Sequence, residues 1–122
     1  GKVYNTSVII SEHTYRQAED SVEVRELDLL QVKGKESPVT IYELLGRKGE
    51  LDDATHHMCD LFGSGLTHYR QQEWTEAIRF FQRALEMSSD DGPSRVFIHR
   101  CHEFMKSPPP PDWDGVYRLT TK

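Results

Sequence analysis

The chain is short of basic residues and of long apolar runs, and each shortage excludes a class of function. It has 15 Lys and Arg against 20 Asp and Glu in 122 residues, so its formal net charge is -5. That balance argues against a nucleic-acid partner, which requires a clustered basic face. No apolar run approaches the roughly 20 residues of a membrane-spanning helix, and no signal-peptide pattern is present. We therefore expect a cytoplasmic chain without a membrane segment.

Cysteine is also scarce, and no glycine-rich phosphate loop of the Walker or dinucleotide type occurs. Cys59 and Cys101 are too few and too distant in sequence to indicate a disulfide framework. We expect both to be reduced, packed thiols. Neither has a supporting base at a recognisable spacing, so neither is predicted to be a nucleophile.

Two short clusters contain residue types that bind zinc, because imidazole and thiolate are its usual ligands. They are His56-His57 with Cys59, and His99 with Cys101 and His102. On a helix His99 and His102 share a face, whereas Cys101 belongs to the apolar face. Surface histidines and core thiols are the simpler interpretation, and no metal ligand is predicted.

The first 46 residues have the pattern strand, helix, strand, strand, over residues 8–10, 11–20, 22–32 and 39–46. Ser11 is a suitable N-cap for the short helix. The alternation of the long strand slips at Arg25-Glu26, which indicates a β-bulge. The turn between the last two strands contains Gly34, which gives the backbone freedom, and Pro38, which lacks an N–H.

After a polar connector the hydrophobic period becomes helical, and three helices in antiparallel succession are predicted. Pro93 suits the first turn of the third helix, and the run Pro108–Pro111 ends it and stiffens an extended tail. A Pro-rich run can also dock on an aromatic groove, and that alternative stays open. The three apolar faces are Met58, Leu61, Phe62, Gly65, Leu66, Tyr69; then Trp74, Ala77, Ile78, Phe81, Leu85; then Phe97, Cys101, Phe104, Met105.

The first two helices resemble a tetratricopeptide repeat, a helix pair of about 34 residues. The matching positions are Gly65, Tyr69, Trp74, Ala77, Phe81 and Ala84. Small residues there let the helices approach, and the aromatic residues fill the gaps. The pattern departs from the family at Ser89, where proline is frequent. Since stable arrays need at least about three repeats, the open face of this stub requires a cover, and the tail around Trp113 is one candidate.

The stretch Arg25–Leu44, with Val32-Lys33-Gly34-Lys35 at its centre, resembles the last hairpin of class III nucleotide cyclases. These enzymes make cyclic AMP or cyclic GMP from the nucleoside triphosphate. The resemblance implies that Lys33 contacts the triphosphate and stabilises charge as pyrophosphate leaves. Lys35 is expected to be structural or solvated. Without the surrounding residues a lone Lys-Gly-Lys is weak evidence, and a solvated turn lysine would be the simpler interpretation.

Residues 2–12 look like the segment that follows the Asn-x-x-x-Arg motif of the same family. The resemblance therefore implies that the motif, and the aspartates that bind the metal pair, precede Gly1 in a longer parent enzyme. The parent would use Mg or Mn with ATP or GTP, and this chain alone would have no cyclase activity and no cofactor. A membrane-anchored parent is compatible with the resemblance.

The predicted fold class is α+β: a small antiparallel sheet with one short helix, then three helices and an extended Pro-rich tail. The predicted domains are a C-terminal cyclase segment over residues 1–48, a tetratricopeptide-like unit over 49–107 and the tail over 108–122. The resemblance implies a homodimer through the cyclase part, and the helical unit is a candidate for a peptide or protein partner. The alternative function is a stand-alone protein-interaction module without enzymatic activity.

Overall fold

The computed structural model describes residues 3–4, 6 and 8–120, so Lys2, Asn5 and Ser7 of the cyclase-like start lie outside the described residues. The chain divides into two compact units. The helical unit contains Gly1–Thr6 and Asp52–Asp114, and the sheet unit contains Ser7–Leu51 and Gly115–Lys122. A four-stranded mixed sheet with a short helix is followed by three helices packed together, which confirms the α+β class.

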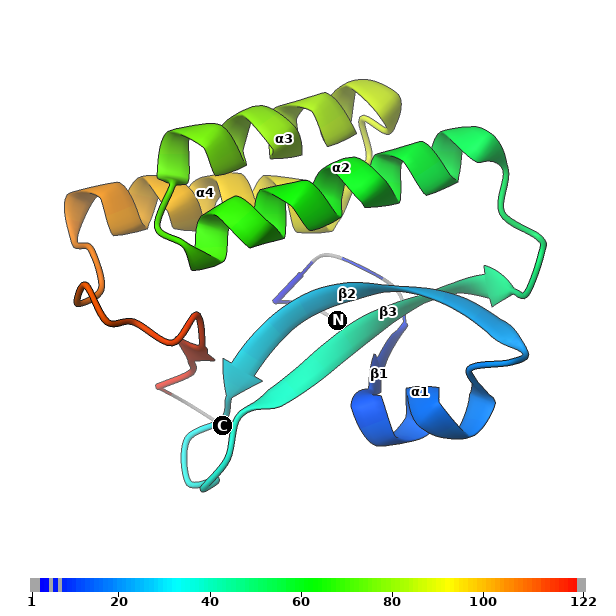
Figure 1. The fold of residues 1–122 in the computed structure, drawn as a ribbon, viewed down its shortest axis with the longest axis horizontal. Coiled ribbons are helices and arrows are strands. Elements are labelled where there is room, and N and C mark those ends of the chain that lie inside the picture. Colours follow the sequence, from blue (N-terminus) through cyan, green and yellow to red (C-terminus); the bar gives the residue numbers. More distant parts are fainter. Residues whose placement is uncertain (1–2, 5, 7, 121–122) are drawn as a thin grey trace. The chain divides into compact units, whose positions relative to one another are not determined.

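The sheet has the strand order β1-β3-β2-β4 (Figure 1). Its members are β1 (Ile9–Ser11), β2 (Val22–Gln31), β3 (Val39–Arg47) and β4 (Tyr117–Arg118). β3 pairs with β1 and β2 in antiparallel fashion, as the hairpin pattern predicted. β4 comes from the tail and pairs with β2 in parallel, which makes the sheet mixed. From the sequence, only an extended chain was predicted at that position.

The bulge predicted at Arg25-Glu26 is replaced by two register shifts that lie on either side of it. Between Glu23 and Val24 of β2, the partner on β3 jumps from Gly46 to Leu44. Between Glu26 and Asp28 the extra residue is on β2 itself, and consecutive side chains there, Leu27 and Asp28, are both buried. A bulge turns two successive side chains toward one face, which explains why simple alternation fails at this point.

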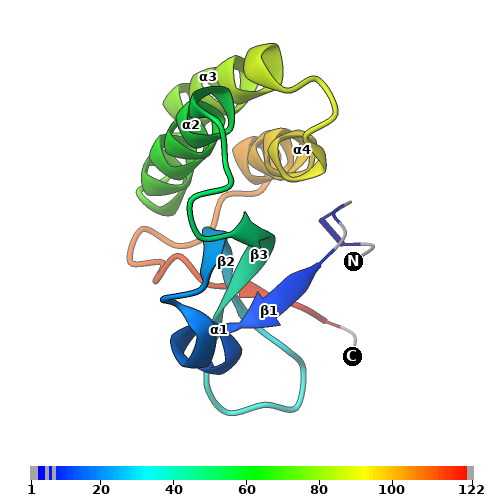
Figure 2. The ribbon, with the colours of Figure 1, turned by 90° about the vertical axis from the view of Figure 1, so that its right-hand side faces the viewer.

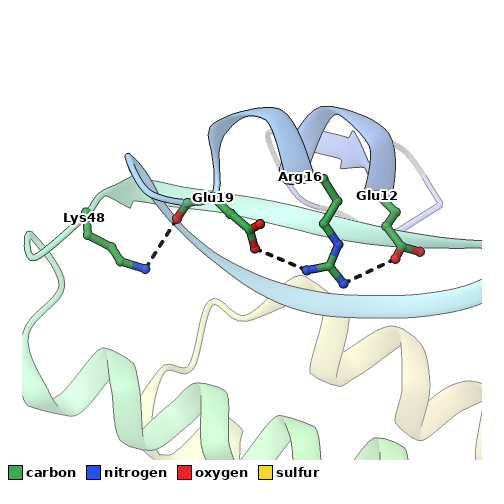
Figure 3. Close-up of polar contacts among 4 residues, drawn as sticks. All are labelled: Glu12, Arg16, Glu19 and Lys48. Atoms are coloured by element: carbon green, nitrogen blue, oxygen red, sulfur yellow. Dashed lines mark hydrogen bonds and ion pairs between the residues drawn. The ribbon is translucent and has the colours of Figure 1, made fainter.

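The short helix α1 (Glu12–Ala18) begins as predicted, with the Ser11 side chain accepting a hydrogen bond from the Thr14 N–H. On its exposed side Arg16 lies between Glu12 and Glu19, at 3.4 and 3.2 Å (Figure 3). These ion pairs raise the pKa of Arg16. Lys48 at the end of β3 donates to the Glu19 carbonyl, so the C-terminal end of α1 is tied to the sheet.

The helical unit consists of α2 (Asp53–Arg70), α3 (Trp74–Met87) and α4 (Gly92–Lys106), with α3 packed against both of the others (Figure 2). Asp52 caps α2 by accepting the Thr55 N–H, and hydrogen bonding from the Thr55 side chain and N–H lowers the pKa of Asp52. Asp91 caps α4 in the same way, and Pro93 occupies the first turn as predicted.

The face predicted for α2 is the observed one, because all six of its members are buried. On α3 the buried set is Ala77, Ile78, Phe81 and Ala84, with Leu85 only partly buried. The core is an aromatic triangle with one ring from each helix. Phe62 lies 5.3 Å from Phe81 and 5.6 Å from Phe97, and Phe81 lies 5.5 Å from Phe97 between ring centroids.

The tail covers one end of the helical unit. The ring of Trp113 lies 5.4 Å from Tyr69, 6.0 Å from Trp74 and 5.4 Å from Phe104. The Pro run is anchored too, since Gln72 donates to the Pro110 carbonyl at 2.8 Å. Trp113 is therefore a cover of the kind the stub was expected to need. None of the helices in the described part of the chain is long and apolar enough to cross a membrane.

Candidate functional site

Lys33 lies in the exposed turn that joins β2 to β3, at the end of the hairpin farthest from α1 (Figure 1). The turn is closed by a hydrogen bond of 3.0 Å from the Lys35 N–H to the Val32 carbonyl. Gly34 has φ of 88°, a left-handed conformation that costs a glycine little. The predicted need for glycine in this turn is therefore confirmed.

The side chain of Gln31 braces the same turn. Its amide nitrogen donates to the Lys35 carbonyl at 2.9 Å and to the Glu36 carbonyl at 3.1 Å. One side chain thus satisfies two backbone acceptors that the turn would otherwise leave to water. The backbone of the turn that carries Lys33 is thus held by hydrogen bonds at Lys35 and Glu36.

Beside the turn lies an open depression of about 320 Å³. Its charged lining residues are Lys33, Lys35 and Arg118, and no acidic side chain lines it. A second depression of about 540 Å³ is also lined by Lys35, but there Glu36 contributes a negative charge. The first depression is lined by three basic residues and by no acidic residue, so it is the candidate anion site in the described part of the chain.

Arg118 lies at this site although its sequence pattern did not predict it. It reaches the turn because β4 pairs with the end of β2, with Leu30 opposite Tyr117 and Gln31 opposite Arg118. The Leu119 N–H donates to the Gln31 carbonyl at 2.9 Å and extends the pairing by one residue. The available signal is weak, because a strand of two residues carries no measurable alternation.

The other residues considered from the sequence do not assemble into a site. Burial raises the pKa of the Cys101 thiol to about 12, so it stays protonated and unreactive at neutral pH. Cys59 is also a free thiol and is partly buried. His99 and His102 are exposed whereas Cys101 between them is buried. No group of three or more His, Cys, Asp or Glu residues within the described ranges could hold a metal ion.

Comparison with curated proteins finds a significant match to "Adenylate cyclase, terminal-differentiation specific" from Dictyostelium discoideum. The two are 28% identical over an alignment of 112 residues, and the match covers 87% of this chain and 5% of that protein. No family model matches the chain, and no solved structure matches it significantly.

The match covers 87% of this chain, which is more than either compact unit contains, so the similarity includes parts of both. A relation confined to the hairpin would stop near residue 46. This chain is thus distantly related to an adenylate cyclase protein over both its sheet and its helices. The region of that protein to which it corresponds is not thereby identified.

Proposed function

We propose that the chain is the C-terminal part of a nucleotide cyclase catalytic domain with a helical extension. In this proposal the parent converts ATP or GTP to the cyclic nucleotide and pyrophosphate. Lys33 contacts the triphosphate and stabilises the negative charge that accumulates on the departing pyrophosphate. The observation that supports this most is the position of Lys33 on an exposed, hydrogen-bonded turn, beside a depression whose charged lining residues are all basic. The similarity to an adenylate cyclase protein supports the same proposal.

This chain alone is proposed to be non-catalytic. In-line attack by a hydroxyl on a phosphate depends on metal ions held by carboxylates. The described residues do not fit such an ion, since no three or more of their His, Cys, Asp or Glu side chains are grouped so that they could bind a metal. No step of the proposal therefore uses a metal bound by this chain. Mg or Mn would be held by residues of the parent that lie elsewhere.

The test is a cyclase assay of the parent with ATP and with GTP in the presence of manganese. Lys33→Ala should lower turnover by about 100-fold, the typical effect of removing one donor to a charge that develops in the transition state. Lys48→Ala is the matched control, because Lys48 also follows a strand of the hairpin but binds the Glu19 carbonyl away from the turn. A folded, dimeric parent that forms neither product would refute the proposal.

A second candidate function concerns the helical unit, which we propose mediates protein or subunit contacts. The specific observation is the close approach of α2 and α3 at Gly65, where an added Cβ would lie 2.5 Å from the Phe81 ring. Such small-to-large contacts are typical of tetratricopeptide helix pairs, whose arrays present binding surfaces. The expected homodimer of the cyclase part is tested separately, by the mass of the parent in solution.

A further inference from the structure

One end of the helical unit holds an indole ring that comes from the tail. We call Tyr69, Trp74 and Phe104 the end cluster, because they lie where α2 ends, α3 begins and α4 ends (Figure 1). The Trp74 ring lies 5.7 Å from that of Tyr69 and 5.1 Å from that of Phe104. The Trp113 ring lies between 5.4 and 6.0 Å from all three. The tail thus adds a fourth ring to a cluster that takes one ring from each helix.

A backbone carbonyl is the second anchor of the tail. The Pro110 carbonyl accepts a hydrogen bond of 2.8 Å from the Gln72 side chain and one of 3.0 Å from the Trp113 N–H. The bond from Trp113 closes a turn over residues 110–113. This turn sets the distance between the carbonyl that Gln72 binds and the indole that the end cluster receives.

Gln72 adopts a strained backbone conformation in the turn between α2 and α3. Its φ is 62°, in the left-handed region that glycine occupies without steric cost. Strained positions of this kind are frequent where a protein contacts a ligand. A glycine would relieve the strain, but it would supply no donor for the Pro110 carbonyl. The contact with the tail therefore explains a glutamine at this position better than the turn does.

The tail resembles a bound peptide more than an element of the core. The run Pro108–Pro111 favours an extended conformation, which loses little entropy when it docks. Pro108, Pro111 and Asp112 are exposed, whereas Trp113 is half-buried. A proline-rich segment anchored on aromatic rings is a recurrent mode of peptide recognition. Here the segment and the rings belong to one chain.

We propose that the end cluster and Gln72 form a binding site for proline-rich protein segments with a tryptophan three residues after the proline that Gln72 binds. The tail occupies this site as an intramolecular ligand. A short tether gives it an effective concentration of roughly millimolar, so a partner binds only where the tail is displaced. The tail is then autoinhibitory for this contact. The identity of the ligand as a partner protein rests on the proposed role of the helical unit in protein contacts.

The experiment supplies the tail as a separate peptide. The 122-residue chain with Trp113→Ala is titrated with a labelled peptide of residues 107–114, up to about 1 mM, the concentration that a short tether provides. Fluorescence anisotropy should show binding at least about tenfold tighter than to the wild-type chain, whose own tail competes. A peptide that carries Trp113→Ala is the matched ligand. It should bind at least about tenfold more weakly than the natural peptide, because it lacks the aromatic anchor.

A second variant leaves all the aromatic rings of the end cluster in place. Gln72→Gly removes the amide donor and suits the φ of 62°. Added to the Trp113→Ala chain, it should weaken peptide binding about fivefold, as expected for the loss of one hydrogen bond. Gln71→Ala is the matched control, since Gln71 is an exposed glutamine next to Gln72. It should change the affinity by no more than about twofold.

Stability gives a readout that is independent of the label. A ligand that binds only the native state raises the unfolding midpoint, so the peptide should restore part of the midpoint lost in Trp113→Ala and leave the wild type unchanged. No binding to Trp113→Ala, or equal binding to the wild type, would overturn the proposal. A wild-type dimer that Trp113→Ala abolishes would also overturn it, because the occupant would then be the tail of a second copy.

This inference and the proposed contact role of the helical unit fail in different ways. Suppose that the peptide binds Trp113→Ala, but that amide exchange in α2, α3 and α4 is no slower in the assembled parent than in this chain. The inference would stand, and subunit contacts through the helical unit would be refuted. No peptide binding, together with slower exchange on these helices in the assembled parent, would refute the inference and sustain the contact role.

Discussion

The residues that define the helical unit are buried, whereas the candidate functional residues of the sheet unit are exposed. In the helical unit these residues are buried, and Phe62, Phe81 and Phe97 are all 0% exposed. In the sheet unit the candidate functional residues Lys33 and Arg118 are exposed at a turn and a short strand. Buried positions recur with a regular period in the sequence, whereas an exposed site is marked only by the identity of its residues. The first kind of information can be predicted from pattern, and the second requires either a resemblance or the structure.

The tail contributes to both units. Trp113 contacts three aromatic rings of the helical unit, and Tyr117-Arg118 adds a strand to the sheet unit. The same short segment therefore packs against the helical unit through Trp113 and brings Arg118 to the candidate site of the sheet unit. The next question is whether a substitution can destabilise one unit and leave the stability of the other unchanged.

The largest expected effect is in the sheet unit, at the cross-strand pair of Arg25 and Glu43. Two guanidinium nitrogens of Arg25 lie 2.7 Å from the same Glu43 oxygen, with side chains 4% and 13% exposed. Removing one partner leaves the other charge buried, so Arg25→Ala should lower the free energy of unfolding by about 3 kcal/mol. The measurement is denaturant unfolding, with amide hydrogen exchange over β2 and β3 to locate the loss.

The control for that prediction is the double variant Arg25→Met with Glu43→Leu, which should recover most of the loss because neither charge of this pair is left without the other. Both tryptophans, Trp74 and Trp113, belong to the helical unit, so their fluorescence reports on it separately. The free energy of unfolding can be obtained both from the fluorescence transition and from the exchange protection of β2. If Arg25→Ala lowers both values by the same amount, the two units unfold together. The stabilities of the two units would then not be independent.

The next effect concerns the cover of the helical unit. Trp113→Ala removes a half-buried indole that contacts Tyr69, Trp74 and Phe104. The expected loss is about 2 kcal/mol, below the 3–5 kcal/mol typical of a fully buried tryptophan. Denaturant unfolding followed by circular dichroism measures it. Trp113→Phe should lose less than half of the stability that Trp113→Ala loses. If Trp113→Ala unfolds at the wild-type midpoint, the tail does not stabilise the helical unit as a cover.

Prediction from sequence succeeded where a pattern repeats and failed where it does not. The buried face of α2 was predicted completely because its 18 residues sample the helical period several times. The irregularity in β2 was predicted near Arg25-Glu26, but one extra residue on each strand moved the register shifts to either side. Arg118 was missed because β4 has 2 residues and pairs with a strand far away in sequence. Lys33 was selected only through the family resemblance, and its role stays a prediction.

The smallest expected effect tests the close approach within the helical unit, through two glycines of α2. At Gly65 an added Cβ would lie 2.5–2.8 Å from atoms of the Phe81 ring, whereas at Gly63 nothing lies within 4 Å. Alanine favours a helix over glycine by about 1 kcal/mol at either position. At Gly65 this gain is exceeded by overpacking, which typically costs 1–3 kcal/mol. Gly65→Ala should therefore destabilise the protein by about 1 kcal/mol.

Gly63→Ala is the matched control, since it makes the same substitution in the same helix at an exposed position. It should stabilise the protein by up to about 1 kcal/mol, so the two variants are expected to move the unfolding midpoint in opposite directions. Two shifts of the same sign would mean that the Phe81 ring moves aside at little cost. The α2–α3 contact would then be adaptable, and Gly65 would no longer support the likeness to a tetratricopeptide helix pair.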